Sequence, residues 1–390
     1  MNRYATALAA LLGATALLAA CGTTAAPASH APAAEAPRGG SDFLDTSAAV
    51  GSTTWAVVVM GGSVATENNF WQLLVRPAGA SSWQLATPPG VADNGGLVLA
   101  GETPQAVIAA FRPSQYLTFT PLTQTGNTGR SWSSASDPIR GALADDPDAL
   151  AAGPAAGQLL AVLTNGTAEV AAPGGTGWRT LASRTQIATT SAGRRCGLGQ
   201  LTAGTFTPAG TPLLAGTCDH LGTAGLFVQA NGSWQSAGPR LPPAIAREQV
   251  SVRSLARTTT GNLALLTAGT GRAQTLYAAR SDSSGTWTMS PPLGLDGAGI
   301  ASVSFGSGGT LAILTTKGRA ATVTSPGQGW QALPKLPART VTLAPASGGA
   351  AIEALAVNRG TLTIWQLKSD RTAWQQIQQI KVPIQYGTSG

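Results

Sequence analysis

The chain has 390 residues, of which only 11% are charged, and it contains 49 glycines and 25 prolines. This balance is typical of short strands joined by many tight turns and excludes a mainly helical protein. The formal net charge is +7, but the basic residues are scattered singly, and only Arg194 and Arg195 are adjacent. We therefore expect no nucleic-acid binding, because proteins that bind nucleic acids gather basic residues in runs or stripes.

Residues 1–20 have the pattern of a signal peptide, with Arg3 before an apolar run and small residues before Cys21. The segment Leu18-Ala19-Ala20-Cys21 resembles the bacterial lipobox, in which the cysteine thiol receives a diacylglyceryl group. The resemblance implies a Cys21 carrying palmitate-type chains, which anchor the protein to the extracytoplasmic side of a membrane. The alternative is an ordinary signal peptide with an incidental cysteine. Residues 21–50 then form a flexible Ala/Pro/Gly linker.

After the linker, seven of the ten tryptophans follow a turn rich in Gly, Ser or Asn, and they lie 43 to 56 residues apart. These tryptophans are Trp83, Trp132, Trp178, Trp234, Trp287, Trp330 and Trp374. A period of this length is typical of propeller blades. In the sixth repeat, residues 300–306, 310–316 and 319–324 alternate with Gly turns before a fourth strand at Trp330. We predict an all-β fold, a seven-bladed β-propeller of four-stranded antiparallel blades over residues 51–390.

The first blade has no clear inner strand of its own. We predict that the C-terminal tail, near residues 383–387 and including Tyr386, supplies this strand and closes the ring. The alternative is an inner strand within residues 42–50 and a frayed tail. Deleting the residues after Lys381 lowers the melting temperature sharply only in the first case.

Two cysteines remain after Cys21, and they lie 22 residues apart within one repeat. In an exported protein, Cys196 and Cys218 most simply form a disulfide. The alternative is a pair of buried free thiols. We expect no metal site, because the chain has only two histidines and one of them, His30, lies in the linker.

The best-preserved turn is Thr125-Gly126-Asn127-Thr128-Gly129-Arg130-Ser131-Trp132. It resembles the Asp-box, the Ser/Thr-x-Asp-x-Gly-x-x-Trp hairpin of bacterial neuraminidase (BNR) repeats, with Asn127 in place of Asp. The resemblance implies that Asn127 closes the turn through backbone amides, that Gly129 adopts a left-handed conformation, and that Trp132 packs between blades. The other six tryptophans follow more divergent copies of this turn. Because sialidases, photosystem assembly factors and sorting receptors share the motif, it indicates a fold and says little about function.

A sialidase-like active site is the alternative to a purely structural use of this fold. Sialidases bind a carboxylate with arginines and use a tyrosine nucleophile with a partner glutamate. The residues that could serve here are Arg112, Arg195, Arg253, Glu248 and Tyr277, with Arg194 and Arg257 as further arginines. The competing interpretation is that the arginines lie in solvated turns and that Tyr277 packs in a strand.

We interpret the chain as a monomeric, membrane-anchored lipoprotein whose propeller is a rigid binding or scaffold module. Its ligand would be an envelope or extracellular protein or glycan, recognised by loops at one face. We expect no cofactor. The alternative is an exo-sialidase or another glycoside hydrolase, which would require the arginines and Glu248 to converge on the propeller axis.

Overall fold

The computed structural model describes residues 45–61, 69–88, 97–111, 120–133, 142–173, 177–306, 308–345 and 351–382. These residues belong to one folded unit, Asp42–Gly390. The predicted signal peptide, Cys21, the linker up to residue 44, Arg112 and the tail at 383–387 lie outside the described residues. Within the described ranges, no helix is both long and apolar enough to span a membrane.

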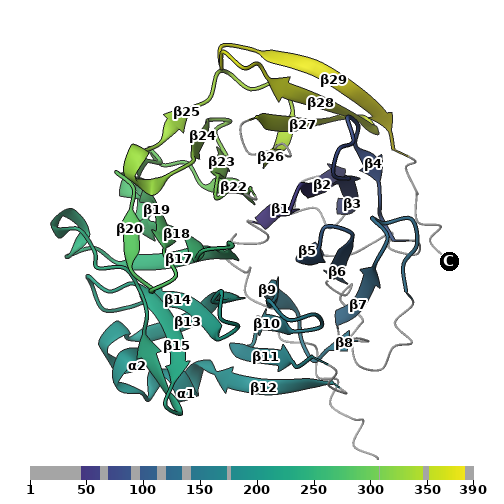
Figure 1. Ribbon diagram of the computed structural model, residues 1–390. Coiled ribbons are helices and arrows are strands. Elements are labelled where there is room, and N and C mark those ends of the chain that lie inside the picture. The colour runs from purple at the N-terminus through teal and green to yellow at the C-terminus, as the bar shows by residue number, and fades with distance from the viewer. Residues whose placement is uncertain are drawn as a thin grey trace, which may run out of the picture. The chain divides into compact units, whose positions relative to one another are not determined.

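Strands dominate the folded unit, and successive strands pair antiparallel in groups of four (Figure 1). The first three groups are β1 Asp45–Val50, β2 Thr53–Gly61, β3 Asn69–Arg76 and β4 Gln84–Leu85; β5 Leu97–Thr103, β6 Ala106–Phe111, β7 Thr120–Thr125 and β8 Ala142–Leu143; and β9 Pro147–Ala152, β10 Leu159–Leu163, β11 Thr167–Ala171 and β12 Trp178–Ser183. This order confirms the predicted all-β class and its four-stranded antiparallel sheets.

The second half of the unit continues the same pattern. Its groups are β13 Leu198–Phe206, β14 Pro212–Cys218, β15 Gly225–Ala230 and β16 Ser233–Ser236; β17 Val250–Arg257, β18 Asn262–Ala268, β19 Thr275–Ser281 and β20 Trp287–Met289, with β21 Leu293–Gly294 also on β19; β22 Ile300–Phe305, β23 Leu311–Thr315, β24 Ala320–Val323 and β25 Gln331–Ala332; and β26 Thr340–Pro345, β27 Ile352–Asn358, β28 Thr361–Leu367 and β29 Trp374–Lys381. The strands predicted for the sixth repeat correspond to β22–β25.

The second strand of a group is apolar along its whole length because both of its faces are covered. Every residue of β10, β18 and β23 is buried. In contrast, the last strand, β29, is mostly exposed or half-buried. Figure 1 shows first strands such as β5, β9 and β22 on the inner side of the unit and fourth strands such as β12 and β29 on the outer side. The hydrophobic cores therefore lie between neighbouring groups, as in the cluster shared by Leu160, Phe206 and Phe227.

The inner strand of the first group is β1, which corrects the prediction that the C-terminal tail would supply it. β1 pairs antiparallel with β2, with Ala48 opposite Trp55, so the free edge of β2 is already occupied. β1 matches the inner strand of the alternative, within residues 42–50, whereas the tail near 383–387 lies outside the described residues. A hairpin closed by a two-residue turn at Gly51 costs less chain entropy than a contact between distant ends of the chain. β1 also pairs in parallel with β22, where Ala48 lies opposite Phe305.

The first and last groups are joined by a buried polar cluster. Arg76 at the end of β3 forms an ion pair with Glu353 on β27, and these residues are 4% and 0% exposed. The indole Nε1 of Trp83 donates to Glu353 Oε2 at 2.8 Å, and the Arg76 guanidinium lies 5.5 Å from the centre of the Trp83 ring. From β29, the Gln378 side chain accepts from the Trp83 backbone N–H at 2.8 Å and donates to its carbonyl at 2.9 Å. Side chains thus hold together the two ends of the repeat array.

Two short helices interrupt the strand pattern between β12 and β13, and the sequence analysis did not predict them. α1 spans Arg184–Ala188 and begins with a capping box in which Ser183 and Gln186 bond each other's backbone N–H. α2 spans Ser191–Cys196 and ends at Gly197 in a left-handed conformation. The Ser-x-x-Gln signature of the capping box was legible in the sequence. The predicted disulfide is confirmed, since Cys196 at the end of α2 is bonded to Cys218 at the end of β14.

Candidate binding cavity

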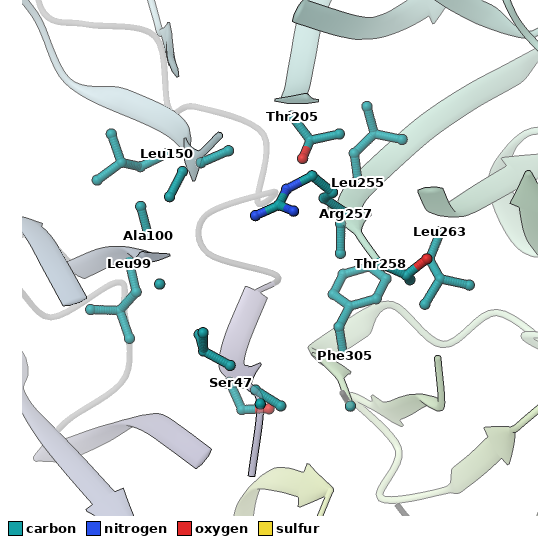
Figure 2. A pocket seen from close by; sticks show the side chains of 18 of the residues that line it. Ser47, Leu99, Ala100, Leu150, Thr205, Leu255, Arg257, Thr258, Leu263 and Phe305 are labelled. Carbon is teal, nitrogen blue, oxygen red and sulfur yellow. The ribbon is translucent and has the colours of Figure 1, made fainter. Parts of the chain in front are cut away.

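A cavity of about 350 Å³ lies where the inner strands of several groups approach one another. Its lining comes from β1, β5, β9, β17 and β22, together with residues of β13 and β18. Large apolar side chains form much of the wall, and Figure 2 labels Leu99, Leu150, Leu255, Leu263 and Phe305 among them. A volume of this size is at the lower end of the range for small-molecule sites, roughly 300–1,000 Å³.

Arg257, the last residue of β17, carries the only charged side chain among the described residues that line the cavity. Figure 2 shows its guanidinium extending into the space between Leu150 and Leu255. The side chain is half-buried, and Nη2 donates to the Gly153 carbonyl at 3.3 Å. Nε is buried without a hydrogen-bond partner. Burial lowers the pKa of Arg257 from its ordinary value, because a charge loses solvation in an apolar surrounding.

Ser47 on β1 contributes a second unpartnered polar group to the lining. It is only 4% exposed, and its Oγ is buried without a hydrogen-bond partner. A buried hydroxyl that makes no hydrogen bond is costly. The same holds for Ser302 and for the indole nitrogens of Trp178 and Trp330, so this feature alone does not indicate a ligand site. What distinguishes the cavity is the half-buried guanidinium of Arg257 among apolar side chains.

The turn that begins at Thr125 is held by side-chain hydrogen bonds. Asn127 Oδ1 accepts from the Ser131 backbone N–H at 3.0 Å, and Thr125 Oγ1 accepts from the Gly129 N–H at 3.0 Å. Gly129 has φ +79°, and a Cβ built on it would lie 2.5 Å from Ala86 Cβ. Only glycine fits this conformation and this close approach.

After this turn, the tryptophan reaches the preceding group of strands. Trp132 Nε1 donates to the Ala86 carbonyl at 2.9 Å, just beyond β4. Trp287 and Trp374 repeat the contact, donating to the carbonyls of Ala237 at 2.7 Å and Pro334 at 3.4 Å. These indoles tie neighbouring groups together, whereas Trp83 bonds Glu353 instead.

Two further turns contain an acidic residue near the position of Asn127: Asp282 precedes its tryptophan by five residues, as Asn127 does, and Asp370 precedes its tryptophan by four. Asp282 Oδ1 accepts from the backbone N–H of Ser284 at 2.8 Å and of Thr286 at 3.0 Å, and Asp370 Oδ1 accepts from the Thr372 N–H at 3.0 Å. The hydrogen bond from the Ser284 hydroxyl lowers the pKa of Asp282, and the hydrogen bond from the Thr372 backbone lowers that of Asp370.

The remaining repeat tryptophans are placed differently. Trp234 is 7% exposed in the core between the third and fourth groups. The indole nitrogens of Trp178 and Trp330 are buried without a hydrogen-bond partner. The seven tryptophans thus share a place in the repeat and differ in their bonding.

Solved structures show what this arrangement resembles. A protein from Lactobacillus plantarum matches with a TM-score of 0.53 and 12% identity, covering 84% of this chain and 96% of its own. A proposed 6-phosphogluconolactonase from Bacteroides fragilis matches with a TM-score of 0.51 and 12% identity, covering 87% and 96%. The domain is a β-propeller. YCF48 from Cyanidioschyzon merolae, at a TM-score of 0.43, 14% identity and coverages of 84% and 93%, is too distant to support an argument. No protein-family model and no curated protein matches the chain.

On this propeller, the described candidates Arg195, Arg253, Glu248 and Tyr277 do not line the cavity, whereas Arg257, one of the further arginines, does. Tyr277 is 4% exposed in the core between the β13–β16 and β17–β20 groups. Arg195 on α2 and Glu248 after β16 are exposed, and His220 Nδ1 contacts the Arg195 backbone carbonyl at 3.1 Å. Arg253 shares β17 with Arg257, and burial lowers its pKa. Arg112 lies outside the described residues.

In the sequence, Arg257 is one of several candidate arginines, and no pattern distinguishes Ser47. The available signal was positional, since Arg257 ends an inner strand just before the Thr258–Gly261 turn. Among the described residues, no group of three or more His, Cys, Asp or Glu side chains is placed to hold a metal ion.

Proposed function

We propose that this protein is a membrane-anchored extracytoplasmic lipoprotein whose propeller is a rigid module that binds an envelope or extracellular ligand in the cavity. The observation that carries the proposal is the half-buried guanidinium of Arg257, which extends into a cavity lined mainly by apolar side chains (Figure 2). Apolar pockets with a few convergent polar groups are the usual form of ligand sites. The rigid strands around the cavity hold its shape before a ligand arrives.

The finer architecture belongs to the same proposal. We assign the strand groups to seven four-stranded blades, with the turns at Asn127, Asp282 and Asp370 as Asp-box relatives. The hydrogen bonds from backbone amides to these side chains support that assignment, as do the indole contacts to the preceding group. In this view the motif stabilises the ring, and the ligand is bound elsewhere.

The anchor rests on the lipobox at Leu18–Cys21. Expressed in a bacterial host fed an alkyne analogue of palmitate, the wild-type chain is expected to incorporate label and to sediment with membranes. Cys21→Ser is expected to lose both the label and the sedimentation, while Thr24→Ser, in the neighbouring linker, keeps both. An unlabelled wild-type chain would disprove the lipid anchor.

Ligand binding is tested by native mass spectrometry of the full chain released from envelope membranes. We expect a small-molecule adduct on the wild-type protein and its loss in Ala151→Trp, because Ala151 is half-exposed on β9 and lines the cavity. Ala78→Trp, on an exposed turn, is the matched control and should retain the adduct. A wild-type protein without any adduct, or an adduct that survives in Ala151→Trp, contradicts binding in the cavity.

The glycoside hydrolase alternative gains no support from the described residues, because Tyr277 is buried in a hydrophobic core whereas Glu248 and Arg195 are exposed. Turnover of a fluorogenic sialoside by the purified protein, abolished in Tyr277→Phe, would reverse this choice.

A further inference from the structure

We infer that the cavity takes a small monocarboxylate with an apolar body, and that the guanidinium of Arg257 is the group that binds the carboxylate. The inference rests on the proposed binding function and names the class of ligand for that site. It follows from three features of the cavity: the unneutralised charge of Arg257, the end of the Arg257 guanidinium that extends into the cavity, and the apolar side chains of the wall.

The charge of Arg257 is not neutralised within the described residues. No carboxylate forms an ion pair with it, and its hydrogen bond goes to a neutral backbone carbonyl, that of Gly153. By contrast, the buried Arg76 forms an ion pair with the buried Glu353. A partly desolvated cation without a counter-charge favours the arrival of an anion. The same loss of solvation lowers the pKa of Arg257.

The end of the guanidinium selects among anions. Nε is enclosed by the protein, but the end of the guanidinium extends into the cavity (Figure 2), where its terminal N–H groups can meet a planar carboxylate. A single guanidinium matches the single charge of a carboxylate, whereas a phosphate dianion needs further cations, and Arg257 is the charged residue among the described lining. A cationic ligand would be repelled.

The wall of the cavity determines which body the ligand can have beyond its carboxylate. Leu99, Leu150, Leu255 and Phe305 present aliphatic and aromatic surface, which favours a hydrocarbon body over a polyhydroxylated sugar. With about 350 Å³ available, the body is small.

The test compares acids with their neutral amides. The full lipidated chain in nanodiscs is titrated calorimetrically with hexanoate and 3-phenylpropionate, and with hexanamide and 3-phenylpropionamide, and empty nanodiscs provide the blank. We expect at least one acid to bind about 10- to 100-fold more tightly than its amide, as charge-assisted hydrogen bonds do. Equal binding of acid and amide, or no binding of either acid, overturns the inference without reference to any variant.

Variants then assign the effect to Arg257. Arg257→Gln should lose the preference for the acid and leave amide binding unchanged, and Arg257→Lys should keep part of the preference. Arg247→Gln, an exposed arginine outside the lining, is the control and should bind as the wild type does. An unchanged acid preference in a folded Arg257→Gln protein overturns the assignment. If neither acid binds but the native adduct disappears in Ala151→Trp, the cavity binds another class of ligand, and the proposed function stands without this inference.

Discussion

The buried cluster of Arg76, Trp83 and Glu353 makes a quantitative prediction about how the propeller is closed. Replacing Glu353 with alanine removes the ion pair to Arg76 and the acceptor of the Trp83 indole N–H. Nε and Nη2 of Arg76 already lack hydrogen-bond partners. In this variant the guanidinium of Arg76, a residue that is 4% exposed, would have lost its partner, and no described residue replaces that hydrogen bond.

The size of the effect follows from burial. Removing one partner of a buried ion pair costs about 3–5 kcal/mol, because the remaining charge stays desolvated. Unfolding the unit Asp42–Gly390 changes the entropy by about 0.7 kcal/mol/K at ~2.1 cal/mol/K per residue. Glu353→Ala should therefore lower the melting temperature by about 4–7 °C.

Urea denaturation at pH 7 and scanning calorimetry measure the two quantities. The control is Asp296→Ala, since the Arg319–Asp296 pair has side chains that are 52% and 72% exposed. A pair of this kind contributes only about 0–1 kcal/mol. If Glu353→Ala costs no more than Asp296→Ala, the buried cluster does not hold the first and last groups together, and the closure argument fails.

Three further predictions concern pH, the disulfide and one turn. Burial raises the pKa of Glu353 above its ordinary 4.5, so the folded state retains this proton to higher pH than the unfolded chain does. The free energy of unfolding that this proton contributes is fully present below pH 4.5 and is lost as pH rises through the raised pKa. Urea titrations from pH 4 to 8 should show this loss in the wild type and not in Glu353→Gln. If the free energy of unfolding of both proteins varies with pH in the same way, the prediction is wrong. The double variant Cys196→Ser/Cys218→Ser opens a loop with a sequence separation of 22 and should lose about 3 kcal/mol, which calorimetry checks against the wild type; an unchanged melt argues against this value. Gly129→Ala should destabilise the fold by about 2–4 kcal/mol, because alanine disfavours the left-handed φ and its methyl group would clash with Ala86. The control Gly79→Ala should cost less, since Gly79 has φ +74° but open space around it. Equal losses of stability in the two variants would show that the clash contributes nothing.

The repeat was legible in the sequence because strand alternation, Gly turns and tryptophans are local signals. In the turn that was singled out from the sequence, Asn127 accepts from a backbone amide, Gly129 has a positive φ, and Trp132 donates to the preceding group. The disulfide was likewise accessible, since only two cysteines remain after Cys21. Each of these inferences depends on residues close in sequence or on a choice among few partners.

Ring closure and the cavity were decided only by the tertiary structure. Residues 42–50 and 383–387 were both plausible inner strands from the sequence, and only the structure shows that β1 pairs with β2. Arg257 looked like any other arginine in the sequence, because the cavity that it lines is formed with residues of β1, β5, β9 and β22, which are distant from it along the chain. Local chemistry therefore determined the repeating unit of this protein, while burial and pairing between distant segments determined where it closes and where a ligand can bind.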